Sequence, residues 1–150
     1  MSYWLMKSEP TEYSIESLEK DWRSSWFGIR NYQARNYMRD SMQIWDRVLF
    51  YHSNCKIPGI VGVAEVVSIP HSDMTQFELE NKYYDPKATY EKPIWKCIDI
   101  GFIKKFPQII SLEQIRKIPT LSNMKLLQKG NRLSISPVSD TEYNSIILLI

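Results

Sequence analysis

Two consecutive strand-like segments constrain the fold of this chain more than any other feature. Along Arg47 to Ser53 the residues alternate between two faces, with Val48, Phe50 and His52 on the same one. After a short loop, Gly59 to Ile69 is rich in Val and Ile and apolar on both faces, which is typical of a central strand. Strands joined this closely pair antiparallel, so the sheet is predicted to start from a hairpin.

Further strands and helices are predicted around this pair. The other predicted strands are Tyr3 to Lys7, Pro93 to Phe106, and Arg132 to Ser136 stopped by Pro137. Predicted helices follow the caps Ser14, Ser111, Ser122 (ending at Gly130) and Ser139, and another covers Asn31 to Ser41. Strands and helices do not alternate, so we predict one α+β domain over residues 1–150. Its mostly antiparallel, strongly bent sheet would close into a small β-barrel with flanking helices.

The composition excludes several classes of protein. Apolar residues make up 43% of the chain, enough to build a core. No apolar run approaches the roughly 20 residues of a membrane span. Met1 to Lys7 lacks the basic start and long apolar stretch of a signal peptide. We therefore predict a cytoplasmic protein with no membrane partner.

Sequence motifs for metals, cofactors and common catalytic sites are missing. The two cysteines and two histidines show no CxxC or HxxxH spacing, which predicts reduced thiols and no metal site. There is no GxSxG elbow, Walker loop or Rossmann glycine pattern. The sequence therefore predicts no cofactor.

Arginines are concentrated between Trp22 and Arg47. Five arginines stand there against two aspartates, a local charge of +3 in a chain whose formal charge is +2. Arginine can hold a phosphate through two parallel hydrogen bonds, so this segment is a candidate nucleic-acid contact. A solvated helix face would show the same pattern, and the small overall charge does not by itself indicate a partner.

Polar residues at strand ends form the candidate site. They lie at Lys7 to Glu9, at His52 to Asn54, at Pro137 to Ser139, and in the segment from Trp26 to Asn36. If the barrel closes, several of them meet at one rim and make a concave site with aromatic walls. A nucleobase suits such a site, because its faces stack on aromatic rings for about 1–3 kcal/mol and its edge takes hydrogen bonds.

Ordinary structural roles compete with these assignments. Trp4, Trp45 and Trp95 lie in or beside strands and are expected in the core, which leaves Trp26 as the favoured wall of a site. His52 could act as a general base, although a strand histidine bonded to the backbone is more common. Neighbours in an extended strand point to opposite faces, so Ser8 shares a face with Lys7 and Glu9 only if the strand ends there.

Seven stretches of the sequence resemble the EVE domain family of the PUA-like superfamily. They are YWLMKSEP, WFGIRNYQARNYMR, VLFYHSN, GIVGVAEV, TQF with YYDP, PIW and RLSISPVS, and they follow the family's order over nearly the whole chain. One departure lies in the turn before VLFYHSN. The family has an acidic residue with glycine there, and this chain has Ile44-Trp45-Asp46.

The resemblance implies a single PUA-like domain that binds nucleic acid, modified DNA in preference to RNA. Its pocket would hold a flipped, modified base such as 5-methylcytosine without catalysis. Carried over by motif, the pocket residues are Lys7, Ser8, Trp26, Asn31, Tyr32, His52, Ser53, Asn54, Pro137, Val138 and Ser139. Arg30, Arg35 and Arg39 would hold the flanking phosphates.

Two alternatives stay open at this point. The related ASCH domains suggest a hydrolase of modified cytidine, in which Lys7, Ser8 and Glu9 would be the reacting groups. Other PUA relatives suggest an RNA-binding module with a vestigial base pocket.

Overall fold

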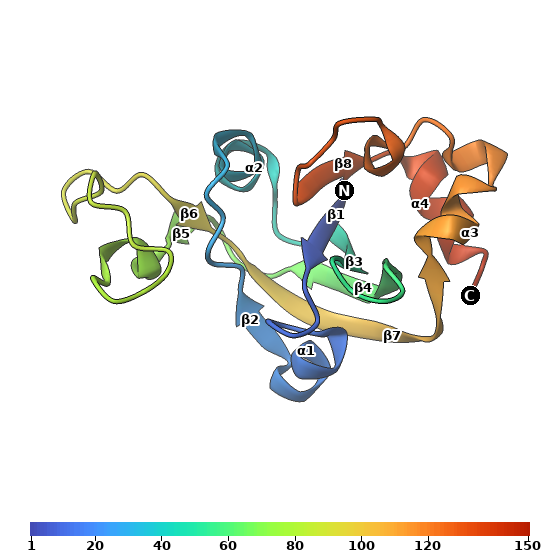
Figure 1. The fold of residues 1–150 in the computed structure, drawn as a ribbon, viewed down its shortest axis with the longest axis horizontal. Coiled ribbons are helices and arrows are strands. Elements are labelled where there is room, and N and C mark those ends of the chain that lie inside the picture. The colour runs from blue at the N-terminus through green and yellow to red at the C-terminus, as the bar shows by residue number, and fades with distance from the viewer.

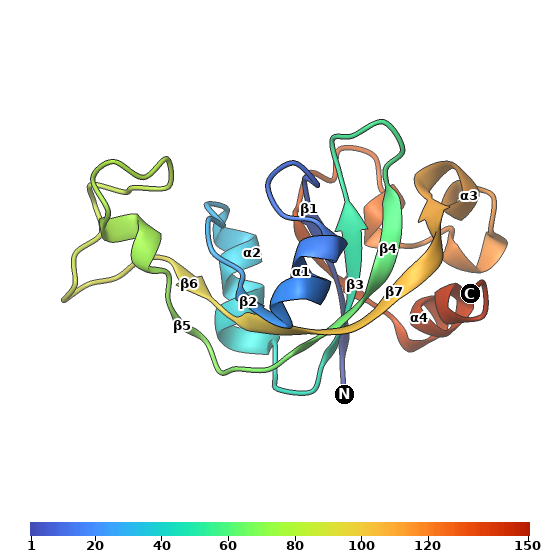
Figure 2. The ribbon, with the colours of Figure 1, turned by 90° about the horizontal axis from the view of Figure 1, so that it is seen from below.

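A curled, six-stranded mixed sheet forms the body of the molecule in the computed structural model, which describes residues 1–150 (Figures 1 and 2). Its order is β2-β7-β4-β3-β1-β8. The strands are β1 (Tyr3–Ser8), β2 (Arg23–Ser25), β3 (Arg47–His52), β4 (Gly59–Val66), β7 (Asp99–Ser111) and β8 (Ile135–Val138). Only β1 and β3 pair in parallel, and every other neighbouring pair is antiparallel. This confirms the predicted bent, mostly antiparallel sheet, although β2 and β8 do not pair and the barrel stays open.

Each face of the sheet carries its own hydrophobic core. Phe50 and its neighbours on one face pack under α1 (Ile15–Asp21), α2 (Tyr32–Asn36) and the π-helix η1 (Tyr37–Ser41). Leu49 and Tyr51, one residue away on the same strand, belong to the second core. That core packs against α3 (Leu112–Arg116), η3 (Pro119–Leu121), η4 (Lys125–Leu127) and α4 (Asp140–Ile147). The predicted alternation along β3 is thus confirmed, and it separates the helices into two groups.

The predicted caps account for most helix boundaries. Ser14, Ser111 and Ser139 each accept a hydrogen bond from a backbone N–H in the first turn of the following helix, and Ser139 forms a full capping box with Glu142. The longest helix, α4, has eight residues, so none of the helices could span a membrane.

Two boundaries near the C-terminus differ from the prediction. In place of one helix after Ser122, the chain makes only the short 3-10 turn η4, and Ser122 itself ends η3. Strand β8 does not stop before Pro137 but runs through it, with Pro137 opposite Trp4. Because β8 is an edge strand, the missing N–H of proline breaks no ladder hydrogen bond on a second side.

A small lobe of residues 71–97 extends from one end of the sheet (Figure 1, left). It contains the short pair β5 (His71–Ser72) and β6 (Lys96–Cys97) and the 3-10 helix η2 (Met74–Phe77). Arg30 anchors this lobe through an ion pair with the buried Asp73 and two hydrogen bonds to the Tyr83 carbonyl oxygen. Residues 81–83 are thereby brought beside the segment that follows β2.

Candidate functional site

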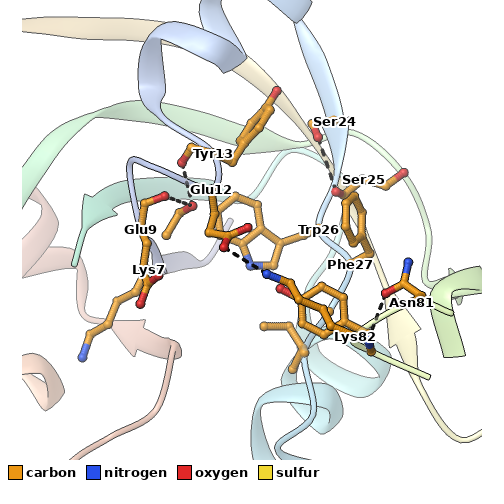
Figure 3. Close-up of a pocket in the computed structure, with 14 residues that line it drawn as sticks. Lys7, Glu9, Glu12, Tyr13, Ser24, Ser25, Trp26, Phe27, Asn81 and Lys82 are labelled. Atoms are coloured by element: carbon orange, nitrogen blue, oxygen red, sulfur yellow. Dashed lines mark hydrogen bonds and ion pairs between the residues drawn. The ribbon is translucent and has the colours of Figure 1, made fainter. Parts of the chain in front are cut away.

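A cavity of about 750 Å³ opens on the α1 side of the sheet, where four stretches of chain meet (Figure 3). Residues 7–9 come from the end of β1, 12–13 from the loop before α1, 24–29 from β2 and beyond, and 81–83 from the lobe. This volume lies within the range of small-molecule pockets, roughly 300–1,000 Å³.

Trp26 forms the aromatic wall of the cavity. Its backbone N–H donates to the Ile98 carbonyl at 2.8 Å, and its ring meets Phe50 edge-on with centroids 5.5 Å apart. The side chain is therefore fixed by the core, with 8% of the residue exposed. A rigid ring at a cavity wall stacks on a flat ligand at little cost in conformational entropy.

Gly28 lets Tyr83 close the other side. Its φ of 87° lies in the left-handed region, and an added Cβ would stand 2.7 Å from the Tyr83 ring. Its N–H also donates to Asp73 at 2.7 Å. Only glycine combines the left-handed conformation with so close an approach of the Tyr83 ring without strain. Gly28 therefore sets the position of the lobe against the cavity.

Charged side chains at the cavity balance one another. Lys7 and Lys82 are matched by Glu9 and Glu12, and no other formally charged residue lines it. Lys82 and Glu12 pair at 3.0 Å between the lobe and the loop before α1. Both are exposed, and such a pair adds little stability and opens readily. A site with no net charge suits a neutral ligand.

Glu9 and Lys7 line the cavity from the end of β1, and they differ in what they offer a ligand. Asn54 donates to one carboxylate oxygen of Glu9 at 2.8 Å and leaves the other oxygen without a partner within the protein. Partial burial lowers the pKa of Lys7, whose ammonium lies 5.9 Å from the centre of the Tyr51 ring. The free oxygen of Glu9 thus offers an acceptor to the edge of a ligand.

The geometry does not assemble the hydrolase suggested by Lys7, Ser8 and Glu9. The Ser8 hydroxyl donates to the Tyr13 carbonyl at 2.6 Å, so no base takes its proton. A nucleophilic serine needs a base in hydrogen-bond contact with its hydroxyl, and Ser8 has a carbonyl oxygen there instead.

A cysteine, a histidine and an aspartate lie in series elsewhere, in and beside the lobe. Cys97 Sγ is 3.5 Å from His71 Nδ1, and His71 Nε2 is 2.8 Å from Asp99. Burial raises the pKa of Cys97 to about 12. The thiol therefore stays protonated near neutral pH and is not an activated nucleophile.

Of the eleven residues predicted for the pocket, the structure brings Lys7, Ser8 and Trp26 to the cavity wall. Asn54 lies just behind it through its bond to Glu9. The remaining seven do not line the cavity, so the expected single rim does not form. They are Asn31, Tyr32, His52, Ser53, Pro137, Val138 and Ser139.

Each of these seven has a structural environment of its own. Asn31 and Ser139 cap α2 and α4, and Tyr32 stacks on Trp95 at 4.9 Å. His52 accepts a hydrogen bond from the Ile15 N–H, and Ser53 pairs through its backbone with Ser8. Val138 is buried in the second core and Pro137 lies in β8.

The three arginines predicted to hold phosphates all have partners within the protein. Arg30 donates five hydrogen bonds to Ile29, Asp73, Thr75 and Tyr83, which occupies the five N–H groups of a guanidinium. Arg35 bonds Asn36 and the Ile94 carbonyl. Arg39 makes two bonds to the adjacent Asp40. A phosphate would have to compete with these contacts.

Sequence reasoning missed the loop and lobe residues of the cavity. Glu12, Tyr13 and residues 81–83 line it, yet none forms a local pattern that marks a site. Tyr83 begins the family-like YYDP stretch, and that is the one signal in the sequence that could have drawn attention to it.

Comparison with known proteins supports a common architecture over the full chain. Thymocyte nuclear protein 1 of Mus musculus is 38% identical, over 99% of this chain and 73% of its own length. A solved protein of Pseudomonas syringae is 42% identical with a TM-score of 0.95, covering 99% of both chains. Human THYN1, solved in complex with 5-methylcytosine containing DNA, is 36% identical with a TM-score of 0.93, covering 99% of this chain and 97% of that one.

A more distant neighbour shares the fold alone. The ASCH protein of Zymomonas mobilis superposes with a TM-score of 0.58 at 11% identity, which is consistent with a PUA-like fold. The EVE domain model matches residues 2–149. The chain therefore belongs to the EVE domain family.

Proposed function

We propose that this protein binds nucleic acid, modified DNA in preference to RNA, and takes a flipped, modified cytosine into the Trp26 cavity without reacting with it. The observation that carries the proposal is the cavity itself, with a rigid indole at its wall and balanced charges around it. The DNA complex of the similar human THYN1 supports a 5-methylcytosine-like ligand.

The groups at the cavity match the chemistry of a cytosine. Stacking on Trp26 would contribute about 1–3 kcal/mol and offset the few kcal/mol needed to unstack the base. The free oxygen of Glu9 can accept from the exocyclic amino group, because carboxylates recognise the N4 amino group of cytosine. Thymine has a carbonyl oxygen at that position, so Glu9 would disfavour it.

Binding of matched oligonucleotides tests the proposal. The wild-type protein should bind DNA with one 5-methylcytosine more tightly than the same DNA with cytosine, measured by fluorescence anisotropy. Trp26→Ala should weaken binding of the methylated DNA by about 5- to 150-fold, the equivalent of one lost stacking contact. Trp45→Ala, which removes an exposed tryptophan that does not line the cavity, should change neither affinity.

Because Trp26 also packs against the core, Trp26→Phe serves as a second variant. It keeps a smaller stacking surface and should show an intermediate loss in a protein whose unfolding curve confirms that it is folded. Equal affinity of the wild type for both DNAs would refute modified-base recognition. Tighter binding of RNA of the same sequence would favour the RNA-binding alternative.

A cytoplasmic location remains a prediction from the sequence.

A further inference from the structure

We infer that a second cleft, beside the cavity and separate from it, holds phosphates of the strand whose base enters the cavity. The cleft has a volume of about 340 Å³ and lies between the α2–η1 helices and the segment that runs from η4 into β8. This inference rests on the proposed function and names a surface for the backbone of the same nucleic acid.

The charge of the cleft is positive and unbalanced. Lys125, Lys129 and Arg132 line it, and no acidic residue does. None of the three takes part in an ion pair within the protein. The cavity beside it has balanced charges, and the three predicted phosphate-binding arginines have internal partners. Free cations gathered in a concave surface attract a polyanion and release its counterions.

Backbone donors in the same segment are also free. The N–H groups of Lys129, Gly130 and Arg132 have no acceptor within the protein. The loop keeps its shape through Asn131 instead, whose side chain donates to the Lys125 carbonyl and accepts from the Leu133 N–H at 2.9 Å. Backbone N–H groups are common partners of phosphate oxygens.

The opposite wall adds neutral polar groups. Gln33 and Tyr37 line the cleft from the helical side, where the Gln33 amide donates to the Tyr37 hydroxyl at 3.2 Å. The Tyr37 hydroxyl hydrogen has no acceptor within the protein and can be donated to a phosphate oxygen. The cleft thus combines charged and neutral donors, as phosphate sites in nucleic-acid-binding proteins do.

Both walls of the cleft continue into walls of the cavity. On one side, residues 26–29 of the cavity lead directly into α2, which carries Gln33. On the other, the Lys7 N–H donates to the Ser134 carbonyl at 2.8 Å, next to Leu133 of the cleft. In Figure 3 the Lys7 side chain extends away from Trp26. A strand with its base against Trp26 could therefore continue past Lys7 into the cleft.

The salt dependence of binding tests the inference. The triple variant Lys125→Gln, Lys129→Gln and Arg132→Gln removes the cleft's charge. Its control, Lys20→Gln, Lys92→Gln and Lys104→Gln, removes the same charge from exposed lysines that line neither site. In a plot of log affinity against log salt concentration, each phosphate contact contributes a slope of about 0.7–0.9. The slope for the cleft variant should be smaller in magnitude than the wild-type slope by roughly 2, and the slope for the control variant should change much less.

Failure of this inference can be told apart from failure of the proposed function. The cleft variant should bind methylated and unmethylated DNA more weakly than the wild type by the same factor, because phosphates carry no base information. Equal slopes for the cleft and control variants would overturn the inference even if Trp26→Ala abolishes the preference for 5-methylcytosine. Competition with polyglutamate provides a further check. If polyglutamate displaces labelled DNA from the wild type with the same efficiency as unlabelled DNA, the inference is overturned in favour of an acidic protein partner. A reduced slope without any base preference would support the cleft and refute the base-reading function alone.

Discussion

At the scale of single residues, His52 shows how a polar side chain at a strand end can serve the fold. Its Nε2 accepts a hydrogen bond from the Ile15 N–H at 3.1 Å, at the start of α1. This requires the neutral ring, and burial lowers the His52 pKa below its ordinary value of 6.5. As pH falls through 6.5, the unfolded chain takes up the proton first and becomes favoured.

The wild-type free energy of unfolding should therefore be highest above pH 6.5 and decline toward the folded-state pKa of His52, by at most about 1.4 kcal/mol per pH unit. His52→Gln keeps an acceptor that does not titrate, so its stability should depend less on pH. Urea denaturation from pH 5.5 to 8 gives the free energy of unfolding of both proteins. The other histidine, His71, is present in both and therefore does not account for a difference between them. Parallel profiles for the two proteins would rule out this role of His52.

Trp45 is a residue in a conformation that suits glycine better. Its φ is 82° and 63% of it is exposed, so it is not in the core as the sequence suggested. A non-glycine residue in this region is strained by about 1–2 kcal/mol. Glycine removes that strain, but it also makes the unfolded chain more flexible, and this offsets part of the gain in stability. Trp45→Gly should stabilise the protein by about 0.5–1 kcal/mol, and Trp45→Ala, which keeps the strain, should not. Thermal and urea unfolding compare the two, and equal stabilities would contradict the strain argument.

At the scale of elements, the position of the lobe depends on Gly28. Gly28→Ala adds a Cβ at 2.7 Å from Tyr83 as well as left-handed strain. Gly130→Ala is the matched control, because Gly130 has a φ of 79° and nothing within 4 Å of its Cβ position. We expect Gly130→Ala to cost about 1 kcal/mol and Gly28→Ala about 1–3 kcal/mol more. Urea denaturation gives both values. An equal loss of stability in the two variants would contradict this expectation, because it would show that the Tyr83 ring moves aside without a cost in free energy.

Local patterns predicted most of the elements and only part of the site. The alternation along β3, the apolar run of β4 and the serine caps were enough to place strands and helices, because these signals lie within a few residues. The polar strand ends and the family resemblance both pointed to Lys7, Ser8 and Trp26, which do line the cavity.

What the sequence did not reveal depends on contacts between distant segments. Residues 81–83 reach the cavity because Arg30 bonds a carbonyl 53 residues away, and no periodicity announces such a contact. Pro137 read locally as a strand stop, and only the edge position of β8 explains why the strand continues through it. Likewise, His52 accepts its hydrogen bond from Ile15, 37 residues away, and this contact became visible only once α1 was placed against β3.

At the scale of the whole molecule, the two proposed binding sites lie on separate surfaces. A cavity with balanced charges and a rigid indole lies on the α1 side of the sheet, and a positively charged cleft lies beside it. Base identity would be read in the first and the backbone held in the second, so specificity and salt dependence should be separable by mutation. The lobe anchored by Arg30 completes the cavity and couples its shape to the stability of the fold.

The most direct test is a crystal structure of the protein with a duplex that carries one 5-methylcytosine. We predict that the methylated base lies outside the duplex, stacked on Trp26, with its exocyclic amino group in hydrogen-bond contact with Glu9. A methylated base that remains paired in the duplex, with the Trp26 cavity empty, would contradict base reading by this protein.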